Sequence, residues 1–87
     1  NIITISPNPF NSSTIIKIPN NQLNIQGIEI YNLRGQRVRS YKIGNQRNFV
    51  IKWNGKHENG EELPSGLYLL NVLMEDRKLT RKITYLK

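Results

Sequence analysis

The chain has 87 residues, the size of one domain, and a chain this short buries only roughly 60–65% of its unfolded surface. One modest core is therefore expected rather than a deep catalytic cleft, and the lack of cysteine excludes disulfides and thiolate metal sites. The formal charge of +7 would suit an anionic partner, but the cations are spread along the whole chain, as on an ordinary solvated surface.

The first segment is a short apolar run (Ile2, Ile3, Ile5) followed by Pro7-Asn8-Pro9-Phe10-Asn11. Proline fixes φ and has no N–H to give to a sheet. Residues 1–11 are therefore predicted to be an extended linker that cannot form a central strand. The chain begins with Asn, has no signal segment and has no run of the ~18 apolar residues that span a bilayer. We expect it to be a piece of a longer precursor.

Three short strands are predicted in the first half of the chain, each bounded by turn residues. Residues 12–18 alternate loosely and stop at Pro19-Asn20-Asn21. Residues 24–31 place Ile28 and Ile30 on one face, and a turn follows in which Gly35 is available for positive φ. Residues 37–43 alternate cations with neutral residues, which is typical of an exposed or edge strand.

The second half of the chain carries the most apolar strands. After a turn at Gly44-Asn45, Phe49, Ile51 and Trp53 point to one face of a core strand. Residues 54–66 form a polar loop, residues 67–74 read as a buried or central strand, and residues 78–86 form a final strand with cations between its apolar positions.

Six or seven short strands, with turn signals at roughly ten-residue spacing and no helix, predict an all-β fold. The expected architecture is an immunoglobulin-like β-sandwich with mainly antiparallel strands, formed by residues 1–87 as one domain; a small barrel is the alternative. The predicted core contains Ile30, Trp53, Tyr68, Leu70 and Val72.

Residues that could carry chemistry are scarce, so no catalytic, metal or cofactor site is predicted and the domain is not expected to be an enzyme. The single histidine, His57, lies in a polar loop. Residues 54–60 resemble a calcium loop faintly, but Lys56 would repel the metal. Tyr31, Tyr41 and Tyr68 on a basic sheet could stack on nucleic acid, yet Tyr68 lies in an apolar strand, so nucleic acid is not the expected partner.

Four stretches in order resemble the C-terminal sorting domain of the bacterial type IX secretion system. They are Pro7-Asn8-Pro9-Phe10-Asn11, residues 30–38 (IYNLRGQRV), Trp53-Asn54-Gly55 with residues 64–68 (PSGLY), and Thr80-Arg81-Lys82-Ile83. Asn54 departs from the aspartate common in related sequences. The matching positions that the resemblance assigns to recognition or folding are Pro7, Asn8, Pro9, Phe10, Asn32, Gly35, Val38, Trp53, Gly55, Gly66, Tyr68, Arg81 and Lys82.

The resemblance implies a non-catalytic address tag at the C-terminus of a cargo protein. Such a domain folds in the periplasm, is recognised by the outer-membrane translocon and is removed by a surface sortase, which can attach the cargo to anionic lipopolysaccharide. The cargo then lies on the cell surface or is secreted. The last basic strand could present the recognised edge through strand addition.

A second interpretation is an immunoglobulin-like accessory or spacer module of a secreted enzyme, either carbohydrate-contacting or similar to the domain of flagellar hook-capping proteins, which shares parts of the third stretch. An independent enzyme would need a pocket of which the sequence shows no sign.

Overall fold

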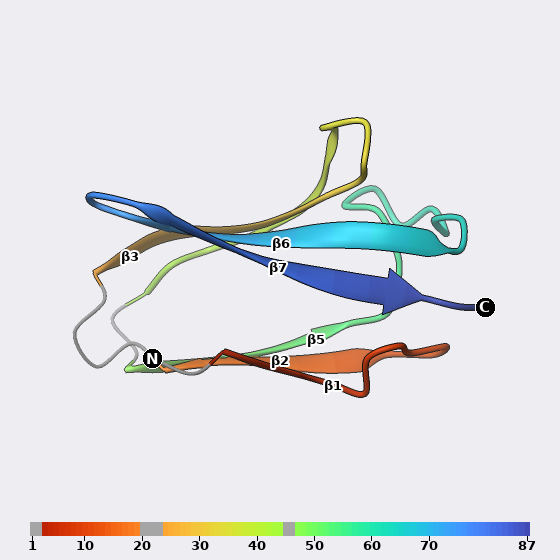
Figure 1. Cartoon of the computed structure of the whole chain (residues 1–87), viewed down its shortest axis with the longest axis horizontal. Helices are drawn as coiled ribbons and strands as arrows, with labels where there is room; N and C mark the ends of the chain where they lie inside the picture. The colour runs from red at the N-terminus through yellow and green to blue at the C-terminus, as the bar shows by residue number, and fades with distance from the viewer. Residues whose placement is uncertain (1–2, 20–23, 45–46) are drawn as a thin grey trace.

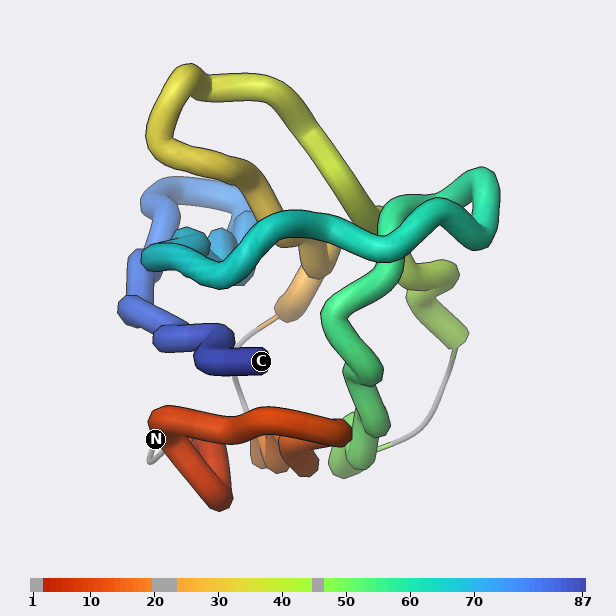
Figure 2. The backbone as a smooth tube through the Cα atoms, turned by 90° about the vertical axis from the view of Figure 1, so that its right-hand side faces the viewer, coloured from red at the N-terminus to blue at the C-terminus, as the bar shows by residue number. Residues whose placement is uncertain are grey.

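The structure is a computed structural model that describes residues 3–19, 24–44 and 47–87. Within these ranges, seven strands form two stacked sheets, one with the strand order β1-β2-β5 and the other with the order β4-β3-β6-β7 (Figure 1). Figure 2 shows the two layers end on. The described residues contain no helix. The predicted all-β sandwich is therefore confirmed, and the barrel alternative is wrong because no strand pairing joins the two sheets in the described part of the chain.

The three-stranded sheet consists of β1 (Thr4–Ser6), β2 (Thr14–Pro19) and β5 (Asn48–Trp53), paired antiparallel. Along β2 the side chains alternate between core and solvent, which is the period of two of a half-buried strand. The register places Thr14 opposite Trp53 and Ile18 opposite Phe49, so the apolar positions of both strands face the other sheet.

The four-stranded sheet consists of β4 (Arg37–Tyr41), β3 (Ile25–Tyr31), β6 (Gly66–Met74) and β7 (Lys78–Tyr85), again paired antiparallel. As predicted, β4 is an edge strand and β6 is central. The register of β6 and β7 runs without a shift from Gly66 opposite Tyr85 to Leu73 opposite Lys78. The second edge of this sheet is therefore the last strand of the chain.

The core lies between the sheets and includes all five residues predicted for it. Trp53, Ile30, Leu70 and Val72 are fully buried and Tyr68 is 3% exposed. The other buried apolar side chains come from both sheets and from one segment outside the strands: Phe10, Ile16, Ile18, Ile25, Ile28, Val38, Phe49, Met74, Ile83 and Tyr85.

The N-terminal segment differs from the predicted linker. Thr4–Ser6 pair with β2, and Phe10 is buried in the core and forms a parallel bridge with Tyr85. Residues 7–9 form a bend, and the Ser6–Pro7 and Asn8–Pro9 peptide bonds are cis. Residues 4–10 are thus part of the sandwich. The local pattern excluded a central strand correctly, but it carried no information about pairing at a sheet edge.

The turns predicted at Asn20-Asn21 and at Asn45 lie outside the described residues. The loop between β5 and β6 spans residues 54–65, as expected, and contains an isolated bridge between Lys56 and Glu62.

Candidate recognition surface

Four aromatic side chains meet at the end of the sandwich where β7 finishes. The ring centroids of Phe10 and Tyr85 are 4.8 Å apart and nearly parallel, and Trp53 lies 5.5 Å from Phe10 and 5.3 Å from Tyr68. We call these four residues the aromatic cluster. It joins the first and third motif stretches, because Phe10 packs directly on Trp53. Tyr85, which sequence analysis did not single out, packs against both of these residues. Its only signal was its place on the apolar face of the last strand.

The loop after β5 is anchored to this cluster by the polar ends of the aromatic side chains. The Trp53 indole N–H donates to the Lys56 carbonyl at 3.1 Å, and the Tyr68 hydroxyl donates to the Pro64 carbonyl at 2.6 Å. Such bonds satisfy groups that would otherwise be buried without a partner. The buried Gly55 has a φ of 75° and lies against the Tyr85 ring.

Residues 7–10, which we call the N-terminal strap, run along the outer edge of β7. The Phe10 N–H donates to the Thr84 carbonyl at 3.0 Å, and the Leu86 N–H donates to the Phe10 carbonyl at 2.8 Å. The Asn8 side chain accepts from the Thr84 N–H and donates to the Lys82 carbonyl, so its amide takes the place of a backbone peptide unit.

Pro7 directly follows β1, and at this residue the chain passes from the three-stranded sheet to the edge of β7. The Pro7 carbonyl accepts a 2.7 Å hydrogen bond from the fully buried Thr14 hydroxyl. Thr14 is the one buried polar side chain among the described residues, and this bond satisfies it. In Figure 2 the N-terminal segment crosses beneath the C-terminal strand.

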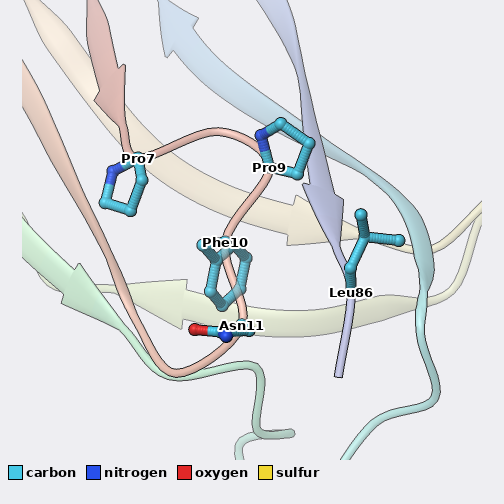
Figure 3. A pocket seen from close by; sticks show the side chains of 5 residues that line it. All are labelled: Pro7, Pro9, Phe10, Asn11 and Leu86. Atoms are coloured by element: carbon cyan, nitrogen blue, oxygen red, sulfur yellow. The ribbon is translucent and has the colours of Figure 1, made fainter.

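A concave surface of about 340 Å³ lies between the strap and the end of the chain. Pro7, Pro9, Phe10, Asn11 and Leu86 line it (Figure 3). Leu86 is 51% exposed and both prolines are exposed, so the lining is apolar and accessible to solvent. Three motif positions thus contribute to one surface feature built from both ends of the chain.

The second motif stretch forms the turn between β3 and β4. The Asn32 carboxamide oxygen accepts from the backbone N–H groups of Arg34 and Gln36, and the Asn32 backbone bonds Gln36 and Gly35. Gly35 has a φ of 84°, as expected for this turn, and Gly66, with a φ of 157°, also has a backbone conformation that residues with a side chain rarely adopt. A groove of about 350 Å³ is lined by both this turn and residues 63–68, so the second and third stretches adjoin.

Arg81 and Lys82 stand apart from the aromatic cluster, and both are exposed. Lys82 contributes its carbonyl to the strap, while its side chain lies on the outer face of the sheet. Arg81 lies two and four positions before the buried Ile83 and Tyr85, so it belongs to the same inner face of the sheet. Its side chain is nevertheless exposed. Its guanidinium donates to the Thr80 carbonyl at 3.0 Å.

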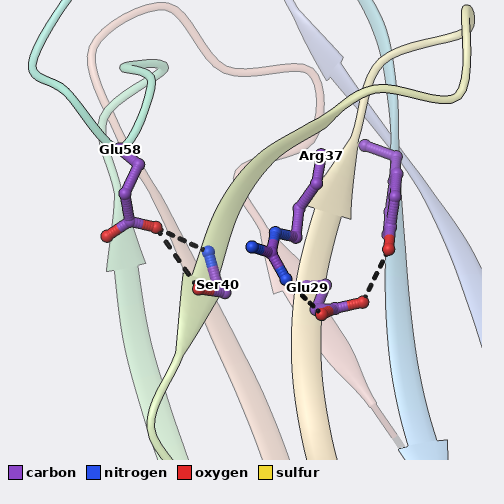
Figure 4. A network of polar contacts seen from close by, with 5 residues as sticks. Glu29, Arg37, Ser40 and Glu58 are labelled. Atoms are coloured by element: carbon purple, nitrogen blue, oxygen red, sulfur yellow. Dashed lines mark hydrogen bonds and ion pairs between the residues drawn. The ribbon is translucent and has the colours of Figure 1, made fainter.

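Two carboxylates organise the β4 side of the sheet (Figure 4). Glu29 pairs with Arg37 at 3.1 Å, and Glu58 accepts from the Ser40 N–H at 2.9 Å while its own N–H donates to the Val38 carbonyl. The Ser40 N–H holds the pKa of the Glu58 carboxyl below its usual value. The loop carrying Glu58 therefore covers part of the outer edge of β4.

The candidates for other chemistry are not brought together. The three tyrosines considered for nucleic acid form no common platform, because Tyr68 is buried while the Tyr31 hydroxyl donates to Glu29 on the outer face. The His57 imidazole accepts from the Asn59 N–H in its own loop. Within residues 3–19, 24–44 and 47–87 no group of three His, Cys, Asp or Glu side chains could hold a metal ion. No helix long and apolar enough to cross a membrane occurs in those ranges.

A family model described as the secretion system C-terminal sorting domain matches residues 4–85. Among solved structures, the chain is similar to PorZ of Porphyromonas gingivalis, described as an essential bacterial surface component of the type-IX secretion system. The TM-score is 0.72 at 16% identity, over 98% of this chain and 11% of PorZ.

Dimeric latent PorU from Porphyromonas gingivalis is also similar, with a TM-score of 0.69 at 22% identity, over 97% of this chain and 9% of PorU. These likenesses show the fold and confirm the immunoglobulin-like sandwich, while the chain spans about a tenth of either protein. Comparison with curated protein sequences finds no match.

Proposed function

Because the chain belongs to the family of secretion system C-terminal sorting domains, we propose that it directs a covalently linked N-terminal cargo protein through the outer membrane by the type IX secretion system. Membership in the family implies export to the cell surface or secretion. The observation that carries the proposal is the match over residues 4–85, which includes all seven strands.

The proposed route has three steps: the domain folds in the periplasm, the outer-membrane translocon recognises it, and a surface sortase removes it. A cut upstream of Ile3 would break no described contact of the sandwich, since pairing starts at Thr4. The domain could therefore be released as a folded unit. The charge of +7 suits an approach to anionic lipopolysaccharide, to which the sortase would attach the cargo.

We propose that most of the motif residues act indirectly, by stabilising the structure that the translocon recognises. Phe10, Trp53, Gly55 and Tyr68 hold the aromatic cluster or its loop together, and Asn32 with Gly35 shapes the adjoining turn. Pro7 and Pro9 remain exposed around the concave surface and could contact the translocon directly.

The test is a fusion of the 87-residue chain to the C-terminus of a periplasmic reporter, expressed in a host with type IX machinery. We expect the reporter on the cell surface or in the medium, and in the periplasm when the machinery is deleted. A second fusion lacks residues 78–87, which removes the buried Ile83 and Tyr85 and leaves β6 as an unfinished edge. That fusion should not be exported.

Retention of the complete fusion in the periplasm, in a host that exports its own cargo normally, would overturn the sorting function. The accessory or spacer module would then be the better interpretation.

A further inference from the structure

The outer edge of β7 has two halves with different partners. The half from Lys82 to Leu86 is closed by the N-terminal strap through four hydrogen bonds of 2.8–3.0 Å. The strap begins at Pro7, and the residues before it, Thr4–Ser6, belong to the other sheet as β1. In the described part of the chain, no strand or strap pairs with the half from Lys78 to Arg81. We call the stretch from Lys78 to the N–H of Lys82 the open edge, since only the carbonyl of Lys82 is bonded by the strap.

The backbone groups that face the open edge follow from the strap bonds. The backbone groups of Lys82, Thr84 and Leu86 that bond the strap point outward, away from β6. Along a strand, residues whose backbone groups face outward alternate with residues whose backbone groups face the neighbouring strand, and the register of β7 with β6 has no shift. Lys78 and Thr80 therefore face outward as well. The N–H groups of Thr80 and Lys82 have no acceptor among the described residues, and the Thr80 carbonyl is bonded by the exposed Arg81 guanidinium.

The side chains at the open edge are cationic on both sides. Lys78 and Lys82 are exposed on the outer face, and Arg81 is exposed at the inner side with its guanidinium lying at the edge itself. None of the three forms an ion pair with any residue that the structure describes. Charges of this kind keep an edge from pairing with apolar strands. Free N–H donors together with cations instead favour a partner rich in acceptors and negative charge.

We propose that the open edge, Lys78 to Lys82, binds an extended, carboxylate-bearing segment of a partner protein by strand addition. Backbone pairing to Thr80 and Lys82 would supply register, and carboxylates would contact Lys78, Arg81 and Lys82. The inference rests on the proposed function where it takes this partner to be a component of the export machinery. The strap limits the added strand to the first half of β7.

A direct test uses the purified 87-residue chain and a short, capped synthetic peptide that alternates valine with glutamate. Amide NMR shifts are followed during titration. We expect the largest changes at Thr80 and Lys82, and weaker binding at high salt, because exposed charges are screened. A peptide alternating valine with lysine should not bind.

Two pairs of variants separate the contribution of backbone pairing to binding from the contribution of charge. Both Thr80→Pro and Thr80→Val lose the hydrogen bond from the Thr80 hydroxyl to the Asn71 side chain of β6, so they differ in the backbone N–H. Thr80→Pro removes this outward N–H and should weaken binding about tenfold or more, while Thr80→Val keeps it and should bind like the parent. Lys78→Glu with Lys82→Glu should abolish binding. The same charge change at Lys17 and Lys52, exposed on the other sheet, should leave it intact.

The second arm measures export of the reporter fusions. Export should fall to about a tenth with Thr80→Pro and stay normal with Thr80→Val. If the parent fusion is not exported, the sorting function is wrong and the peptide titration still decides the edge. Two results would overturn the open edge as a binding site. The first is that the largest amide NMR shifts lie on β5. The second is that peptide binding is unchanged both in Thr80→Pro and in the Lys78/Lys82 double variant.

Discussion

The backbone of Gly55 passes so close to the Tyr85 ring that a Cβ built there would lie 2.5 Å from the ring atom Cζ. Its φ of 75° is also a conformation that residues with a side chain resist. Gly35 shares the second property, with a φ of 84°, but a Cβ at Gly35 would meet nothing within 4 Å. Comparing substitutions at the two glycines therefore separates the cost of backbone strain from the cost of overpacking.

Gly35→Ala should cost about 1 kcal/mol in the free energy of unfolding, from backbone strain alone. Gly55→Ala adds overpacking against the aromatic cluster and should cost about 2–4 kcal/mol in total. Urea denaturation of both variants and the parent measures the difference. Equal losses at the two sites would show that Tyr85 moves aside at little cost.

At the scale of elements, the strap connects the first motif stretch to the last strand of the chain, because it bonds the outer edge of β7. An edge strand exposes unpaired backbone groups, and β7 would expose them along its full length without the strap. Asn8 satisfies two of these groups with its side chain, and Phe10 satisfies two more with its backbone. At the opposite edge, the loop carrying Glu58 plays the same part for β4.

Asn8→Ala should lower the free energy of unfolding by about 1 kcal/mol, because it removes two exposed hydrogen bonds to β7. The local effect should be clearer, since the Thr84 N–H loses its acceptor and its hydrogen exchange should accelerate. Asn11→Ala is the matched control, because Asn11 is exposed and its side chain forms no hydrogen bond with any residue that the structure describes. Unchanged exchange at Thr84 in Asn8→Ala would contradict the strap.

At the scale of the whole molecule, the N-terminal segment is the part whose role changes most between sequence and structure. A linker could be removed without loss of stability. In the structure the same segment supplies β1, the strap and the buried Phe10. A domain of this size has a small core, so few buried residues can be spared.

Deletion of residues 1–10 is therefore expected to unfold the domain or to lower its melting temperature steeply. Loss of a buried phenylalanine alone costs about 3–5 kcal/mol, a large part of the 5–15 kcal/mol that is usual for a domain. Near-ultraviolet circular dichroism of the aromatic cluster reports the loss. Deletion of residues 1–2 leaves all described residues in place and serves as the control. A variant lacking residues 1–10 that melts with the parent would restore the linker interpretation.

Most strands could be located from the sequence, because their apolar residues alternate with period two and glycine, proline or asparagine stands between them. The same pattern identified the core, since Ile30, Trp53 and Leu70 occupy inward positions of apolar strands. Individual motif residues could also be named, and the turn at Gly35 was predicted because positive φ is a local property of glycine.

What the sequence determined by itself was the six strands after residue 11, the all-β class and five residues of the core, because these depend on local periodicity and turn chemistry. Only the tertiary structure decided that Asn8 meets Lys82, 74 positions further along the chain, and that Tyr85 stacks between Phe10 and Gly55. Such contacts depend on which strand becomes an edge and where the chain changes sheets. No local pattern encodes that choice, because it follows from the packing of all seven strands together.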